Sequence, residues 1–257
     1  MSKKNCKISF LFIILSLFGH SSFADDASSI TLPKFNIYTE DWVPFQFHTE
    51  EIELDGMAVE LLELIFKTIG SKQNRNDMSL VPWARAMQSL EKKNTIVFSM
   101  TVTDERLPKY QWVGPIYDIN SYIYVKSDSN LSKADFNDGN TLLTSIIIGD
   151  VNFQYMPGLY IDKDRITSVS PSDSPLKMLS LGRVDFIIDN KLNFKDVAMR
   201  AGLNVEDFKR LFVVDSAPIS YAVSLNTSEG YVHKMQNAVN SIKASPAYTE
   251  LLKKYDL

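Results

Sequence analysis

The sequence has 257 residues, with 27 Lys and Arg, 31 Asp and Glu and three His, and its formal net charge at pH 7 is −4. An acidic chain without a basic block lacks the charge that binding to nucleic acid requires. It also lacks the charge for binding to an anionic membrane surface, so we expect neither partner.

The N-terminus has the three-part pattern of a secretory signal peptide. Lysines among the first seven residues precede the apolar run Ile8–Phe18, and Ser22–Ala24 offers small residues for cleavage after Ala24. The apolar run is shorter than the roughly 20 residues that span a membrane. We therefore expect residues 1–24 to be a signal peptide, and the protein after cleavage not to be inserted in a membrane.

The position of the single cysteine, Cys6, excludes two further features. Cys6 precedes the apolar run, whereas a lipid-anchored protein would need its cysteine after that run. Cleavage would leave no cysteine for a disulfide, so the core must be stabilised by burial alone. Loss of the three N-terminal lysines would move the formal charge from −4 to −7. We expect a protein that is free in a Gram-negative periplasm.

Strand-like and helix-like segments alternate after residue 33. The predicted strands are Phe35–Thr39, Leu80–Val81, Ile96–Met100, Tyr122–Val125, Leu142–Ile148 and Val184–Ile188. The predicted helices are Gly56–Ile69, Trp83–Lys92, Ser174–Leu181 and Ser245–Tyr255. Gly70 is placed to end the first helix, and Ser-Pro pairs, with Ser as the N-cap, are placed to begin the last two. This alternation predicts an α/β protein with mostly parallel sheets.

Three motifs occur in a fixed order. Trp42–Phe45 and Gly56–Leu61 read WVPF and GMAVEL, Ser99–Arg106 and Gly114–Tyr117 read SMTVTDER and GPIY, and Gly182–Asp189 reads GRVDFIID. Together they resemble solute-binding protein family 3, the periplasmic amino-acid-binding proteins of ABC importers. The resemblance covers essentially the whole chain after the signal peptide.

The resemblance implies a type II periplasmic-binding-protein fold, with two α/β lobes and a ligand cleft between them. Lobe 1 would comprise residues 30–119 and 218–257, and lobe 2 would comprise residues 120–217. Two crossing strands, Ile119–Val125 and Ala217–Ser224, would join the lobes. Ligand binding would then favour a closed state.

Arg106 is the first candidate for ligand binding. The resemblance assigns a ligand carboxylate to the matching arginine, and a guanidinium offers the two-pronged donor that a carboxylate needs. Thr101 and Thr103 could add hydroxyl and backbone N–H donors. The alternative interpretation of Arg106 is a surface arginine that lies near Asp104 and Glu105.

Aromatic residues form a second group of candidates. The resemblance places an aromatic ligand contact at Trp42, which would stack on the ligand or lie over its cation. For Phe45 we expect core packing. Trp83 follows a predicted strand and begins a predicted helix, where loops face the cleft in α/β sheets. Ligand contact and core packing both stay open for Trp83.

Two departures from the family pattern concern the other half of the cleft. The family has an Asp five residues after Asp185, where this sequence has Asn190, with Asp189 one residue earlier. Either Asp189 receives the α-ammonium group, or the ligand lacks one. Asp150, at a predicted helix start, would repel a carboxylate if it faced the cleft. Asn152 could hydrogen-bond to many ligands.

The sequence carries no signal for a metal or a cofactor. After signal cleavage the histidines are His48 and His233, which lie far apart, and no cluster has metal-ligand spacing. No Gly-rich phosphate loop and no Gly-x-Ser-x-Gly elbow occurs.

Three functions fit the resemblance. The first is a binding protein that captures a small polar ligand with a carboxylate and delivers it to an ABC permease. The second is a sensor that signals to a separate membrane receptor. The third is an enzyme similar to cyclohexadienyl dehydratase, with Glu40, Asp41 or Asp189 as its acid or base. We expect the first, and not an enzyme.

Overall fold

The larger sheet has six strands in the order β2-β1-β3-β8-β4-β7. These strands are β1 (Asn36–Thr39), β2 (Met78–Leu80), β3 (Thr95–Thr101), β4 (Gln111–Lys126), β7 (Ile187–Asn190) and β8 (Phe208–Val223). A second sheet pairs β5 (Thr144–Ile147) with β6 (Ile166–Val169). The computed structural model describes residues 32–48, 54–137, 141–170 and 174–257. The expected signal peptide and Cys6 lie outside the described residues.

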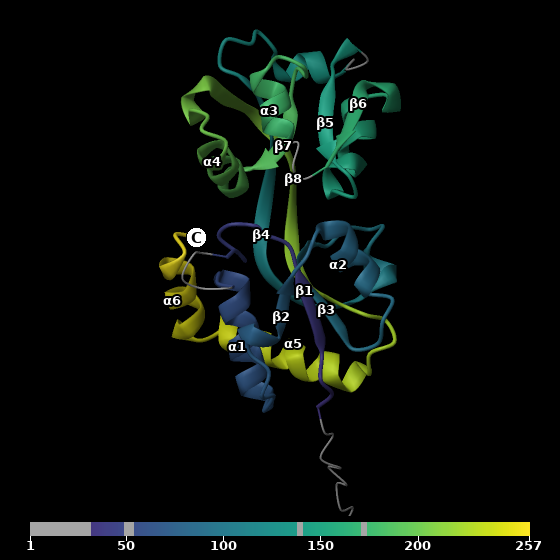
Figure 1. Cartoon of the computed structure of the whole chain (residues 1–257), viewed down its shortest axis with the longest axis vertical. Coiled ribbons are helices and arrows are strands. Elements are labelled where there is room, and N and C mark those ends of the chain that lie inside the picture. The colour runs from purple at the N-terminus through teal and green to yellow at the C-terminus, as the bar shows by residue number, and fades with distance from the viewer. Residues whose placement is uncertain (1–31, 49–53, 138–140, 171–173) are drawn as a thin grey trace, which may run out of the picture. The chain divides into compact units, whose positions relative to one another are not determined.

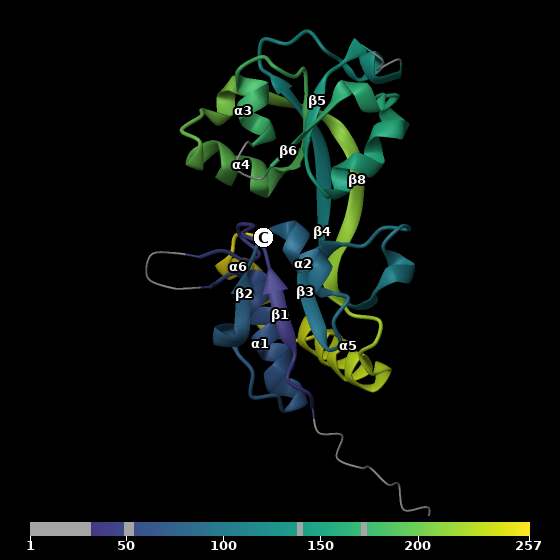
Figure 2. The ribbon, with the colours of Figure 1, turned by 45° about the vertical axis from the view of Figure 1, so that its right-hand side comes forward.

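The prediction of mostly parallel sheets is wrong for the larger sheet. Strand β1 runs parallel to β2 and β3, but the pairs β3–β8, β8–β4 and β4–β7 are antiparallel. The cause is the pair of 16-residue strands β4 and β8, which run side by side in opposite directions (Figures 1 and 2). The chain runs along β4 in one direction and returns along β8 in the opposite direction.

The buried residues form separate hydrophobic clusters, by which we define two lobes. The first lobe contains α1 (Met57–Ile69), α2 (Trp83–Ser89), α5 (Glu229–Lys243) and α6 (Pro246–Lys254). The second lobe contains α3 (Pro175–Ser180) and α4 (Lys191–Arg200). Strands β4 and β8 contribute residues to the clusters of both lobes.

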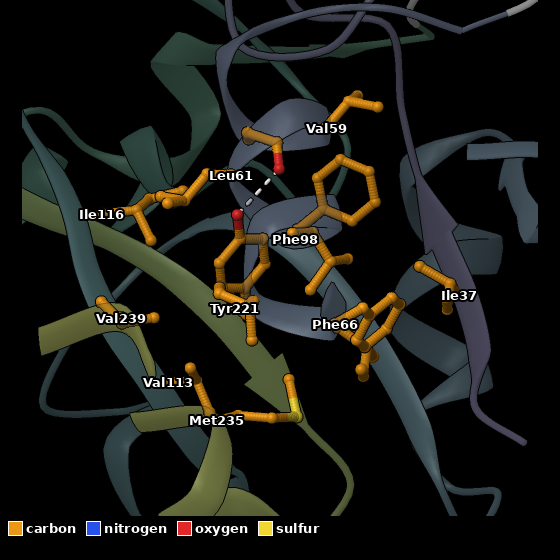
Figure 3. Packing of buried hydrophobic residues seen from close by; sticks show 14 of the residues in the cluster. Ile37, Val59, Leu61, Phe66, Phe98, Val113, Ile116, Tyr221, Met235 and Val239 are labelled. Atoms are coloured by element: carbon orange, nitrogen blue, oxygen red, sulfur yellow. Dashed lines mark hydrogen bonds between the residues drawn. The ribbon is translucent and has the colours of Figure 1, made fainter. Parts of the chain in front are cut away.

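Tyr221 on β8 marks the centre of the first lobe. Its ring is fully buried, and its hydroxyl donates a 2.7 Å hydrogen bond to the carbonyl of Ala58 on α1 (Figure 3). Met235 and Val239 of α5 lie near Tyr221 in the same cluster. The sheet is therefore fastened to α1 by a hydrogen bond as well as by packing.

Short 3-10 helices connect these elements. In the described residues they are η1 (Arg75–Asp77), η2 (Leu107–Lys109), η3 (Lys133–Asn137), η5 (Val151–Leu159), η6 (Lys163–Arg165) and η8 (Val205–Asp207). The segment η5 follows β5 and carries residues of the site described below. No helix among the described residues has both the length and the apolar character that crossing a membrane requires.

Most predicted elements are confirmed, with shifted ends. Gly70 ends α1 in the left-handed conformation, at a φ of 81°. Helices α3 and α6 begin at the predicted prolines, with Ser174 and Ser245 at the N-cap positions as predicted, but neither serine side chain makes a capping hydrogen bond. The Ser245 hydroxyl instead donates to the Ile242 carbonyl, and the Ser174 hydroxyl is buried with no hydrogen-bond partner among the described residues.

Candidate functional site

A cavity of about 840 Å³ is lined by residues of both lobes. This volume lies within the roughly 300–1,000 Å³ that is typical of small-molecule sites. Its walls come mainly from segments that directly follow β1, β2, β5 and β7. Because ligand sites in α/β proteins form where strands end, this placement is the expected one for a binding site. The cavity brings together Trp42, Trp83, Thr101, Arg106, Asn152, Asp189 and Asn190, all predicted site residues.

Arg106 connects the two lobes by hydrogen bonds to a backbone carbonyl of each. Its Nη1 donates to the Thr101 carbonyl at 3.3 Å, and its Nη2 donates to the Gly149 carbonyl at 3.4 Å. The guanidinium carbon lies 5.6 Å from the centroid of the Trp83 ring. Trp83 Nε1 donates to the same Gly149 carbonyl at 3.1 Å. Trp83 therefore both orients Arg106 and contacts the second lobe.

The surroundings of Arg106 combine burial with a nearby negative charge. Burial lowers the pKa of the guanidinium, and the charge of Asp150 opposes this shift. An arginine side chain remains protonated in proteins because its ordinary pKa exceeds 12. Arg106 thus presents a partly desolvated positive charge to the cavity, and such a charge attracts a carboxylate more strongly than a fully hydrated one.

The side-chain carboxylate of Asp150 caps the N-terminus of η5. Its Oδ1 accepts a 2.8 Å hydrogen bond from the backbone N–H of Asn152. Burial raises the pKa of Asp150, and the charge of Arg106 lowers it in part. The predicted helix start is a 3-10 helix whose first free N–H already has an acceptor. Asn152 lines the cavity, and its side-chain amide donates to the Ile188 carbonyl at 3.1 Å.

Asp189 and Asn190 have different surroundings at the end of β7. Asp189 accepts hydrogen bonds from Asn193 Nδ2 at 2.9 and 3.0 Å and from the Asn190 N–H at 2.8 Å. Burial raises the pKa of Asp189 to about 7. The Asn190 side-chain oxygen caps α4 by accepting from the N–H groups of Leu192 and Asn193. The acidic group at this end of the cavity is therefore Asp189.

The remaining predicted residues divide between cavity and scaffold. Trp42 lines the cavity and packs against Phe45, with ring centroids 4.9 Å apart, while Phe45 is fully buried in the core of the first lobe. Thr101 lines the cavity as well. Thr103 is not among the lining residues, and its hydroxyl oxygen accepts a 3.2 Å hydrogen bond from the Arg106 N–H. Thr103 thus shapes the turn that carries Arg106.

Sequence reasoning missed a contact between the lobes. Arg200 of α4 donates from Nη1 to Asp41 Oδ2 at 2.9 Å, and it also pairs with Asp196. The other oxygen of Asp41, Oδ1, is buried and has no hydrogen-bond partner among the described residues. No helix was predicted for the segment of α4, so nothing in the sequence placed Arg200 at the cavity. The Asn190 cap was the one local signal for this helix.

Glu40 lies beside this contact, on the cavity wall. Burial, together with the charges of Asp150 and Asp41, raises the pKa of its carboxyl to about 8, and the charge of Arg106 opposes this rise. Glu40 was predicted only as a candidate acid or base of an enzyme. In the described part of the chain, no group of three or more His, Cys, Asp or Glu side chains could hold a metal ion.

The two-lobed fold and the cavity between the lobes are the architecture expected of a solute-binding protein. The chain belongs to the bacterial extracellular solute-binding proteins, family 3, whose model matches residues 36–256. It is 24% identical over 216 residues to the probable amino-acid-binding protein YxeM of Bacillus subtilis (strain 168). That match covers 82% of this chain and 79% of YxeM.

Solved structures confirm the type II periplasmic binding fold. The arginine-, lysine-, histidine-binding protein ArtJ from Geobacillus stearothermophilus matches with a TM-score of 0.71 at 19% identity, over 86% of this chain and 95% of ArtJ. A histidine kinase sensor domain with similarity to periplasmic binding proteins matches with a TM-score of 0.73 at 13% identity, over 86% of this chain and 96% of that domain. At these identities the likeness establishes the fold.

Proposed function

We propose that this protein captures an amino acid or a closely related carboxylate in the periplasm and delivers it to an ABC importer. The observation that carries the proposal is the placement of Arg106 and Asp189 in one cavity, on different lobes. The first can receive a carboxylate and the second an ammonium group. Family membership and the similarity to YxeM support the same class of ligand.

The contacts of Arg106 suggest how a ligand would be held. The carbonyls of Thr101 and Gly149 accept from Arg106 at 3.3 and 3.4 Å, which are long distances for charge-assisted hydrogen bonds. A ligand carboxylate would make shorter bonds to the same guanidinium. Trp42 and Trp83 would pack against the apolar part of the ligand. Thr101, Asn152 and Asn190 would offer further hydrogen bonds, and Thr103 would act by supporting the turn.

We propose lobe boundaries at residues 30–119 and 218–257 for the first lobe and 120–217 for the second. Pairing of Ile119 with Ala217 on β4 and β8 supports this division, because the hydrophobic clusters change from the first lobe to the second just beyond that pair. Segments Ile119–Val125 and Ala217–Ser224 would be the crossings. A ligand that contacts both lobes would shift the population toward a closed form.

The proposed location rests on family membership and the N-terminal pattern. The family is extracellular, and residues 1–24 have the charge and apolar pattern of a cleaved signal peptide. A sensory role is the second candidate, favoured by the likeness to the histidine kinase sensor domain. Docking on a permease or on a separate receptor would use the same ligand-bound state. The two roles differ in the membrane partner that co-purifies with the liganded protein.

An enzymatic role is the weaker candidate, although Glu40 could serve as a buried acid or base because of its raised pKa. Incubation with prephenate or arogenate tests this directly. Turnover would assign the protein to the dehydratase class. Stabilisation of the protein by an amino acid, without turnover, supports the binding role.

The proposal is tested by a thermal-shift screen of purified protein that has been unfolded and refolded to remove bound ligand. The panel contains the standard amino acids, dicarboxylates, polyamines and prephenate. A ligand at 100 times its Kd stabilises the native state by about 2.7 kcal/mol, which is readily detected. A rise in the melting temperature with an amino acid supports the proposal. No response to any amino acid or dicarboxylate would contradict it.

A further inference from the structure

We propose that Gln46, which does not line the cavity, is a positioning residue for ligand binding and acts through a buried hydrogen bond to Ser99 on the cavity wall. This bond holds the turn of Trp42 and the end of β3 in a fixed relation to each other. The inference rests on the proposed function, in which Trp42 packs on the ligand and Arg106 binds its carboxylate. It adds a residue that determines affinity without touching the ligand.

The turn that carries Trp42 is closed by the backbone of Gln46. The Trp42 N–H donates to the Gln46 carbonyl at 2.6 Å, and the Gln46 N–H donates to the Trp42 carbonyl at 3.0 Å. Trp42 lines the cavity, whereas Gln46 is 1% exposed and lies behind the wall. A movement of Gln46 would therefore displace the backbone that carries the Trp42 side chain.

Ser99 has a backbone conformation that serine rarely adopts. Its φ is 62°, in the left-handed region that most residues other than glycine avoid. Ser99 is buried and lies where the pairing of β3 with β8 shifts in register, between Val97 and Met100. Such a conformation persists only where the surrounding structure holds it, and it is common at binding sites. Because Ser99 also lines the cavity, its conformation points to a role in binding.

The Ser99 hydroxyl supplies a contact that can hold this conformation. It donates a 2.5 Å hydrogen bond to Gln46 Oε1, from 53 positions away in the sequence. Both residues are buried, so the loss of either side chain leaves the other without this partner, which is costly inside a protein. A buried polar contact of this kind fixes the relative placement of two backbone segments more narrowly than apolar packing alone does.

The segment that Ser99 holds leads directly to Arg106. Two residues after Ser99, the Thr101 carbonyl accepts a hydrogen bond from Arg106 Nη1 at 3.3 Å. The bond between Gln46 and Ser99 therefore links the turn of Trp42 to the strand end that orients the guanidinium. A ligand that contacts both groups depends on their spacing, because binding groups must be held to within about 0.5 Å of the productive geometry.

The test is a double-mutant cycle measured by calorimetric titration. The probe is whichever of the standard amino acids and dicarboxylates in the thermal-shift panel binds the unchanged protein most tightly. Gln46→Met removes the acceptor at a similar side-chain length, and Ser99→Ala removes the donor. Each variant should bind at least fivefold more weakly. The double variant should bind no more than twofold more weakly than the weaker single variant, because both substitutions break the same bond.

Tyr221→Phe is the matched control, because it also removes a buried hydrogen bond in the first lobe, at a residue that does not line the cavity. It should lower the melting temperature and leave the affinity within twofold of the unchanged protein. Ser99→Gly is the second variant, in case Ser99→Ala does not fold. Glycine adopts a φ of 62° without strain but lacks the hydroxyl, so this variant should also bind at least fivefold more weakly.

Crystal structures of the free protein and of Gln46→Met give a readout that needs no ligand. We expect the spacing between Trp42 and Thr101 to change by more than about 0.5 Å. Unchanged affinity in Gln46→Met, fully additive losses in the double variant, or an equal loss in Tyr221→Phe would overturn the inference and leave amino-acid capture in place. If no amino acid or dicarboxylate binds, the proposed function fails and the crystal structures decide the inference, which an unchanged spacing would overturn.

Discussion

Replacement of Arg106 by alanine removes the only group that we assign to the ligand carboxylate. The side chain is held by the Thr101 and Gly149 carbonyls at 3.3 and 3.4 Å, and it stacks on Trp83. Truncation of one member of a buried, hydrogen-bonded charge pair costs about 2–5 kcal/mol. Because the guanidinium already has acceptors in the free protein, we take the lower end of this range. About 2 kcal/mol corresponds to roughly 30-fold weaker binding.

The assay is calorimetric titration with the amino acid that raises the melting temperature most in the screen. Arg85→Ala is the matched control, because Arg85 is an exposed arginine on α2 that does not line the cavity. We expect the control to bind like the unchanged protein and Arg106→Ala to bind about 30-fold more weakly. A second variant, Arg106→Lys, keeps the charge without the two-pronged geometry and should fall between the two.

Binding of Arg106→Ala within threefold of the unchanged protein would refute this reasoning. The carboxylate would then be held elsewhere, and Arg106 would serve only to connect the lobes through Gly149. Circular dichroism of each variant shows whether it remains folded, so a loss of binding is not mistaken for a loss of structure.

Three further predictions concern stability. Gly149→Ala should lower the free energy of unfolding by about 1 kcal/mol, because residue 149 has a φ of 80°, which is unfavourable for alanine. The melting temperature should fall by about 2–4 °C, and an unchanged melting temperature would show that alanine is not strained at this position. Tyr221→Phe should lower the free energy of unfolding, measured in urea, by about 1 kcal/mol without a change in the m value, because a buried hydrogen bond to the backbone is removed. Burial tends to raise the pKa of Asp55 and of Glu63, but hydrogen bonds and the charge of Arg75 outweigh it and lower both pKa values. The stability that these two carboxylates contribute is therefore present above about pH 4 and is lost as pH falls through the lowered pKa values. The unfolding free energy that separates the unchanged protein from Arg75→Ala should therefore shrink between pH 7 and pH 3, and a constant difference would refute this assignment.

Local sequence signals predicted much of the first lobe. The spacing of apolar residues and Gly70 located α1 to within one residue, and the apolar run around Phe98 located β3. These elements are specified by short-range periodicity and by a residue that tolerates positive φ. Helix α5 was missed, although five of its residues are buried, and α4 was missed because its apolar stripe is weak.

Long-range pairing could not be predicted from the same signals. Local signals predicted strand β4 only over Tyr122–Val125 and the resemblance extended it to Ile119–Val125, yet the strand has 16 residues, because its first half is completed by pairing with β8. The same limit applies to the site. The family motif directed attention to Arg106, whereas Arg200 and Asp41 are 159 positions apart and meet only in the folded chain. Asp189 and Asn190 were both candidates, and the capping hydrogen bonds of Asn190 distinguish their surroundings.

The most direct test of amino-acid capture is a crystal structure of the protein with the amino acid that stabilises it most. We predict that the ligand lies in the cavity between the lobes, with its carboxylate about 2.7–2.9 Å from the guanidinium nitrogens of Arg106 and its α-ammonium group on Asp189. A ligand bound outside this cavity, or inside it without contact to Arg106, would contradict the account.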